Sequence, residues 1–74
     1  MGVSYNKLWK LLVDKKMSKA DLRKVSGVSP NTMTKLHRDK PVMLNVLDKI
    51  CNSLGCNYGD IMDFRPDEED LYKN

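Results

Sequence analysis

A pair of short helices joined by a tight turn constrains this chain more than any other feature. Ser18 is followed three residues later by Asp21, the capping-box pattern of a helix start, in which each side chain bonds the other residue's backbone amide. Gly27 ends this helix, because glycine takes the left-handed conformation without a Cβ penalty. Ser29 and Pro30 then start a second helix as N-cap and first helical residue. The sequence therefore predicts two helices with a sharp turn at Gly27.

The apolar residues of these two helices predict which faces are buried. Leu22 and Val25 share one face of the first helix, and Met33 and Leu36 share one face of the second. Val28 anchors the turn between them. The second helix also carries polar side chains that are left for solvent or for a partner: Asn31, Thr34, Lys35 and Arg38.

This spacing resembles the helix-turn-helix of the Cro and lambda-repressor-like (XRE) family of DNA-binding proteins. The resemblance is carried by the capped helix with Leu22, the turn at residues 27–29, and the inward Met33 and Leu36. It implies an all-α fold: a compact five-helix lambda-repressor-like DNA-binding domain in which helices 2 and 3 form the helix-turn-helix.

The sequence departs from the usual pattern of that family at three places. Arg23 stands where alanine is usual, at the close contact between the two helices, so its aliphatic stem must extend outward. Met43 precedes the fourth helix, where a capping Ser or Thr is usual. His37 and Arg38 occupy the end of the third helix, where the family usually has Glu.

The chain before the motif predicts one amphipathic helix. It starts near Tyr5 with Ser4 as its cap. Trp9 lies on this helix, and a single aromatic among apolar residues favours packing against neighbours over stacking on nucleic acid. The inner stripe of the helix consists of Leu8, Leu11 and Leu12.

Two more helices are predicted after the motif. The fourth runs from about Leu44 to Leu54 and ends at Gly55. A last short helix covers Tyr58 to about Asp63, with Asn57 as its cap and Asp60 at its third position. No strand is predicted. The inner face of the fourth helix comprises Leu44, Leu47, Ile50, Cys51 and Leu54.

The five helices are expected to share one core, because 74 residues make a single small domain. We expect this domain to span residues 1–64. Residues 65–74 contain four consecutive acids and are expected to form an acidic, mobile C-terminal tail. The predicted core consists of Leu8, Leu12, Leu22, Val25, Val28, Met33, Leu36, Leu47, Ile50, Leu54, Ile61 and Phe64.

The charges of the chain are divided unevenly along its length. Residues 1–40 hold ten Lys or Arg and three Asp, a net +7, whereas residues 41–74 hold three Lys or Arg and seven acids, a net −4; together they give the overall +3. The basic half contains the predicted motif. A positive surface around such a motif is the electrostatic footprint of phosphate binding.

The family resemblance implies a sequence-specific double-stranded DNA-binding transcriptional regulator, a repressor, whose helix starting near Pro30 enters the major groove. Carried over by position, the expected base contacts are Pro30, Asn31, Thr34 and Lys35. The expected phosphate contacts are Lys19, Ser29, Arg38 and Lys40. The same fold also serves protein-binding adaptors, such as an antitoxin or an anti-repressor, and this alternative stays open. Steep salt dependence of binding would separate the two.

We expect the working form to be a homodimer on a two-fold symmetric site. One short recognition helix covers too few base pairs, so related domains pair to read two half-sites. The C-terminal region holds more apolar material than one small core needs, namely Tyr58, Met62, Phe64, Leu71 and Tyr72.

Other classes of function find little support in the sequence. Cys51 and Cys56, with His37 as the only histidine, do not supply the four ligands of a structural zinc site, so free thiols in a reducing cytosol are expected. No catalytic constellation and no phosphate-binding glycine loop is evident, so we expect no enzyme activity, no cofactor and no small-molecule effector. No apolar run approaches the roughly 20 residues that span a bilayer, and a cytoplasmic location is expected.

Overall fold

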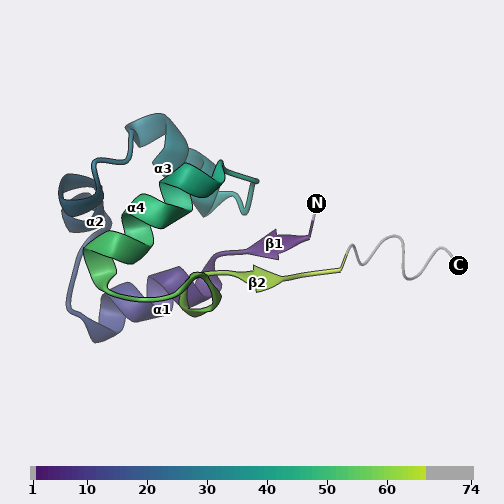
Figure 1. Ribbon diagram of the computed structural model, residues 1–74, viewed down its shortest axis with the longest axis horizontal. Helices are drawn as coiled ribbons and strands as arrows, with labels where there is room; N and C mark the ends of the chain where they lie inside the picture. The colour runs from purple at the N-terminus through teal and green to yellow at the C-terminus, as the bar shows by residue number, and fades with distance from the viewer. Residues whose placement is uncertain (1, 67–74) are drawn as a thin grey trace, which may run out of the picture.

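The computed structural model describes residues 2–66 as a mostly helical domain with a small two-stranded antiparallel sheet at one end (Figure 1). The predicted tail residues 67–74, with Leu71 and Tyr72, lie outside the described residues. In chain order the elements are β1 (Val3–Ser4), α1 (Asn6–Asp14), α2 (Lys19–Ser26), α3 (Pro30–His37), α4 (Leu44–Leu54), the 3₁₀ helix η1 (Tyr58–Asp60) and β2 (Asp63–Phe64).

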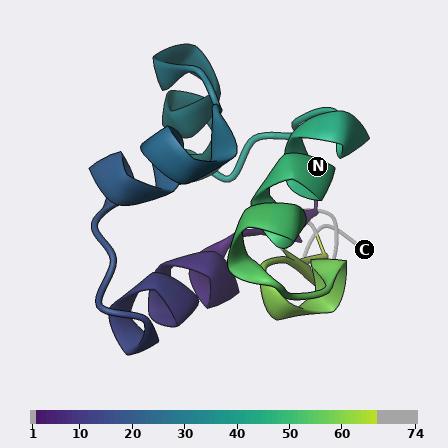
Figure 2. The ribbon, with the colours of Figure 1, turned by 60° about the vertical axis from the view of Figure 1, so that its left-hand side comes forward.

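The two motif helices and α4 begin and end where the sequence predicts. Gly27 and Gly55 follow α2 and α4 in the left-handed conformation, with φ of 72° and 63°. Met43, the N-cap residue of α4, makes no capping side-chain hydrogen bond. Figure 2 shows α2 and α3 as consecutive short helices that stand above α1 in that view.

The predicted fifth helix is wrong in both type and length. Asn57 and Asp60 do form the expected capping box, but it closes only a three-residue 3₁₀ helix. The chain then extends, because Asp63 and Phe64 pair with Ser4 and Val3. Strands of two residues carry no readable alternation of apolar and polar side chains, so this pairing could not be predicted from the sequence.

The start of α1 also differs from the prediction. Ser4 belongs to β1, and the N-cap position falls on Tyr5, which makes no capping side-chain bond. The Ser4 hydroxyl oxygen still accepts a hydrogen bond from the Asn6 amide at 3.3 Å. Tyr5 itself is only 1% exposed, although it is not among the predicted core residues.

The core lies between the helices and contains most of the predicted residues. Leu8, Leu22, Leu36, Ile50 and Ile61 are fully buried, and they come from α1, α2, α3, α4 and the segment after η1. Each helix is shorter than the roughly 12–15 residues that a helix needs to be stable alone, so this shared burial holds the helices in place. The remaining buried apolar residues are Tyr5, Leu12, Val28, Met33, Leu47 and Leu54.

Val25 was wrongly predicted to be buried, since its side chain is 56% exposed. Ser26 occupies the inner position instead, four residues after Leu22 on the same face of α2. Its hydroxyl donates to the Leu22 carbonyl oxygen at 2.7 Å and accepts from the Val28 amide at 3.3 Å. These two bonds satisfy the buried hydroxyl, and the second ties α2 to the turn.

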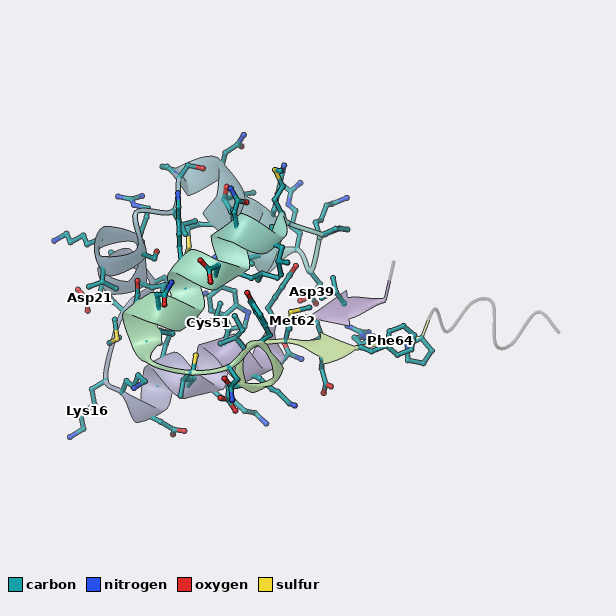
Figure 3. All side chains as sticks on the ribbon, in the orientation of Figure 1. Lys16, Asp21, Asp39, Cys51, Met62 and Phe64 are labelled. Atoms are coloured by element: carbon teal, nitrogen blue, oxygen red, sulfur yellow. The ribbon has the colours of Figure 1, made fainter. Side chains whose placement is uncertain are left out.

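Leu44, predicted on the inner face of the fourth helix, and Phe64, predicted in the core, are both exposed because they lie at the edge of the fold. Leu44 is the first residue of α4 and is 65% exposed, whereas the buried face of that helix begins at Leu47. Phe64 is 77% exposed, because its strand extends away from the helices. Figure 3 shows the Phe64 ring at the far end of β2, beyond the helical body.

Shortening a buried residue of α3 should unfold the whole domain. We expect Leu36→Ala to lower the free energy of unfolding by about 2–5 kcal/mol, a large part of the roughly 5–15 kcal/mol of a small domain. Val25→Ala removes an exposed side chain of similar type and is the control; it should cost under about 0.5 kcal/mol. Urea denaturation followed by circular dichroism measures both. Equal losses would show that the core does not lie where the structure has it.

Candidate nucleic-acid interface

The capping of α2 fixes the entrance to the motif. The Ser18 hydroxyl oxygen accepts a hydrogen bond from the Asp21 amide at 3.0 Å, and the Asp21 carboxylate accepts one from the Ser18 amide at 2.9 Å. These bonds favour the charged carboxylate and hold the pKa of Asp21 below its ordinary value. Lys19, a predicted phosphate contact, is the first residue of the helix and is exposed.

The capping of α3 uses part of the predicted contact set. The Ser29 hydroxyl oxygen accepts from the Thr32 amide at 3.2 Å and shares a 2.9 Å hydrogen bond with the Thr32 hydroxyl. Pro30 follows at the first helical position, as the sequence predicts. The Thr34 hydroxyl donates to the Pro30 carbonyl oxygen at 3.2 Å, which leaves its lone pairs and its methyl group for a partner.

The two faces of α3 differ sharply in character. Met33 and Leu36 are buried, at 7% and 0% exposure. The four residues predicted to contact bases are all exposed: Pro30, Asn31, Thr34 and Lys35. Burial of the apolar face therefore presents these four side chains outward from one rigid helix.

The predicted phosphate contacts lie at the ends of this helix and beside it. Ser29 is its N-cap, Arg38 is its C-cap residue, and Lys40 follows in the loop. Lys19 belongs to α2, yet its Nζ lies 3.3 Å from His37 Nδ1 at the last residue of α3. All four residues are exposed.

A network around Asp39 holds the loop that carries Lys40. Asp39 adopts a left-handed backbone conformation, with φ of 54°, which aspartate tolerates better than most residues. Its carboxylate accepts from the Tyr5 amide at 3.0 Å and lies 3.6 Å from the Arg65 guanidinium. The Tyr5 hydroxyl donates to the Lys40 carbonyl oxygen at 2.9 Å. Burial raises the pKa of Tyr5, so its hydroxyl stays protonated and remains a donor at neutral pH.

Sequence reasoning missed a cluster at the other edge of the motif. Trp9 packs against the core as predicted, but its ring also stacks on His37, with ring centroids 4.8 Å apart and an angle of 13° between the planes. Lys19 Nζ lies 4.9 Å from the centroid of the same Trp9 ring. These residues are 10 to 28 positions apart in the chain, so no local pattern could reveal the contact.

Metal and thiol chemistry find no support in the described part of the chain. No group of three or more potential ligands among His, Cys, Asp and Glu occurs there. Cys51 and Cys56 are free and half-buried, as expected. Burial and the neighbouring Cys56 raise the pKa of Cys51 to about 11, which favours the protonated thiol.

Within residues 2–66 no helix has the length and apolar character that a bilayer crossing requires.

Comparison with known proteins identifies this arrangement. The model of the Cro/C1-type HTH DNA-binding domain matches residues 7–67. The chain belongs to this family. The match spans α1 to β2 and includes both motif helices.

Two similar proteins are transcriptional regulators by name. The chain is 33% identical over 61 residues to an uncharacterized HTH-type transcriptional regulator, YozG, of Bacillus subtilis, which covers 80% of this chain and 73% of that protein. It is 50% identical to the transcriptional regulator VanUg, whose crystal structure superposes with a TM-score of 0.86 over 89% of this chain and 88% of that chain. The relatives of this Cro/C1-type domain are thus named as transcriptional regulators rather than enzymes.

The bond between Tyr5 and the loop can be tested separately from DNA binding. Tyr5→Phe keeps the buried ring but removes the hydroxyl donor to Lys40, so we expect the free energy of unfolding to fall by about 0.5–1.5 kcal/mol. Tyr58→Phe is the matched control, because Tyr58 is 41% exposed and its hydroxyl has no hydrogen bond within residues 2–66. Thermal or urea unfolding compares the two variants. A Tyr5→Phe protein as stable as the control would mean that this bond does not hold the loop.

Proposed function

We propose that this protein is a sequence-specific transcriptional repressor that binds double-stranded DNA and reads the major groove with α3. The observation that carries the proposal is the exposed polar face of α3, which is held rigid by a buried opposite face and a capped N-terminus. An α-helix of this kind fits the major groove, where each base pair presents a distinct pattern of donors and acceptors. The family membership agrees with DNA binding.

The chemistry of that face suits base recognition. The Asn31 amide nitrogen can donate to adenine N7 while the Asn31 amide oxygen accepts from adenine N6–H, which makes a bidentate pair. The Lys35 ammonium can donate to guanine O6 and N7. The Thr34 hydroxyl already donates to Pro30, so it is left to accept from a base amino group or to touch a thymine methyl. Pro30, at the exposed start of the helix, offers a second apolar contact to a thymine methyl.

The proposed phosphate contacts would lie at both ends of α3 and beside it. Arg38 and Lys40 flank its C-terminus, Ser29 its N-terminus, and Lys19 reaches it from α2. Such contacts position a protein on the duplex and do not distinguish sequences. The Asp39 network fixes the backbone of Lys40, which lowers the entropy lost when that side chain binds.

One pair of variants separates base reading from phosphate binding. Asn31→Ala should weaken binding to the preferred duplex by about 1–3 kcal/mol, relax the preference at one base pair and leave binding to random duplex unchanged. Arg38→Ala should weaken binding to both duplexes and reduce the salt slope by about one unit. Both residues are exposed, so neither change should alter the fold.

The measurement is fluorescence anisotropy against salt, after the preferred site has been selected from random duplexes. Uniform losses for Asn31→Ala on every duplex would refute its role as a base reader. If no duplex binds with a steep salt dependence, the protein-binding alternative, an antitoxin or anti-repressor, replaces the DNA proposal.

We further infer that the protein acts as a homodimer through the surface formed by Tyr58, Met62 and Phe64. The eight residues of α3 span only about 12 Å, so a single copy reaches few base pairs, and two copies on half-sites about 34 Å apart reach enough. Phe64 is 77% exposed, Tyr58 is 41% exposed, and Met62 is half-buried beside them. An exposed aromatic of this size on a small sheet favours contact with another protein surface.

Sedimentation of single variants tests the dimer. Phe64→Ala should weaken self-association at least about tenfold, because it removes the largest exposed ring of the proposed surface. Val13→Ala, which changes an apolar residue that is 75% exposed on α1, is the matched control and should leave association unchanged. A wild-type protein that stays monomeric at all concentrations and binds singly to a non-palindromic site would rule the dimer out.

A further inference from the structure

Trp9, Lys19 and His37 meet at the edge of the motif although each belongs to a different helix. Trp9 stacks flat against the His37 ring, while Lys19 Nζ lies 3.3 Å from His37 Nδ1 and 4.9 Å from the centroid of the Trp9 ring. Lys19 and His37 are exposed, whereas Trp9 is half-buried against the core. The cluster thus combines two accessible nitrogen groups with a fixed aromatic surface.

The hydrogen bond between Lys19 and His37 defines where the protons are. A lysine ammonium has three donors and no acceptor, so Nδ1 of His37 must be the acceptor. Nδ1 therefore carries no proton while this hydrogen bond is made. Adding a second proton would turn Nδ1 into a donor and place a positive charge next to the ammonium.

The charged and aromatic groups around His37 come from three helices. On α2, Lys19 contacts the ring and Arg23 lies one turn further along the same face. On α1, the uncharged Trp9 stacks on its ring. On α3, Lys35 and Arg38 are two residues and one residue away and do not share its face. The ion pairs within residues 2–66, Lys7 with Asp63 and Arg65 with Asp39, include neither Lys19 nor His37.

A backbone phosphate can accept hydrogen bonds from both Lys19 and His37, which are exposed and adjacent. We propose that Lys19 and His37 together bind one phosphate of duplex DNA, with Trp9 holding the imidazole ring, and that His37 takes up a proton from solvent as the phosphate binds. The proposal rests on the DNA-binding function above and adds His37 and Trp9 to it. In the bound state the ammonium turns from Nδ1 to a phosphate oxygen, and the doubly protonated imidazole donates to a second oxygen of the same group.

The Trp9 ring can hold the His37 imidazole in both the free and the DNA-bound protein. A flat stack fixes the plane of the imidazole, so that the ring need not be ordered when the phosphate arrives. The face of an indole also attracts cations, which favours the imidazolium and the ammonium alike. The contact is to a phosphate, so it carries no sequence information.

Binding should therefore strengthen as the pH falls. The complex holds more protons than the free protein, by at most one, and lower pH favours the state with more protons. The slope is at most about tenfold in affinity per pH unit, as for linkage to a single proton. His37 is the only histidine of the chain, and histidine is the side chain whose ordinary charge change lies between about pH 5 and 8.

The test is the affinity for a specific and a random duplex between about pH 5.5 and 8, at constant ionic strength and with a fixed DNA sequence. For the wild-type protein we expect several-fold tighter binding to both duplexes at the acidic end. His37→Gln, which keeps a side chain that can bond Lys19 but cannot be charged, should show no such rise. Arg38→Ala is the matched control: its affinity should be lower throughout, but the rise on acidification should remain. Thermal melting at each pH verifies that every variant is folded.

Proton uptake gives a second readout that a purely structural role of His37 would not produce. Calorimetry in two buffers of different ionisation enthalpy should show uptake of a fraction of a proton by the wild-type protein and none by His37→Gln. Parallel pH profiles for these two proteins, or equal proton uptake, would overturn the phosphate pair while leaving DNA binding intact. Failure of every variant and of the wild-type protein to bind any duplex would instead contradict the proposed function itself.

Discussion

Every exposed side chain of the motif depends on the burial of one small core. The helices α1 to α4 are only eight to eleven residues long, below the length at which isolated helices are stable in water. Leu22, Leu36 and Ile50, one from each of α2, α3 and α4, are completely buried and tie the two motif helices to the rest of the domain. Orientation of the polar face of α3 is thus a consequence of hydrophobic burial behind it, and any loss of the core removes the interface as well.

The parts of the fold that the sequence could predict are set by neighbouring residues. The capping box of Ser18 and Asp21, the glycine after α2, and the serine and proline before α3 each act within four residues, and each has the predicted geometry. Burial that depends on distant neighbours was harder to predict. Val25 and Ser26 are adjacent, and only the packing of α2 on α4 decides which of them faces inward. Phe64 is exposed because its strand pairs with residues some sixty positions earlier.

The candidate interface also has features that the sequence predicts and features that depend on contacts between distant residues. The exposed residues of α3 follow from helix periodicity, so their outward orientation could be derived from spacing alone. The surrounding supports could not, because they join separate elements. Asp39 links the loop after α3 to both strands through Tyr5 and Arg65, as its position beside β1 in Figure 3 illustrates. His37 contacts Trp9 and Lys19 across three helices. These contacts between elements determine the positions of Lys19 and Lys40. The polar residues of α3 would determine which DNA sequence the protein recognises.

The central claim is that one face, made of the N-terminus of α2, the polar side of α3 and the loop after it, binds duplex DNA. The most direct measurement is an NMR titration of isotopically labelled protein with a duplex selected from random sequence, followed through the backbone amides and the Asn31 side-chain amide. The account predicts that the largest shift changes fall on Lys19, on residues 29–35 and on residues 37–40, while exposed residues of α4 such as Asn52 stay unchanged. Changes confined to residues 58–64, or spread evenly over the domain, would contradict it.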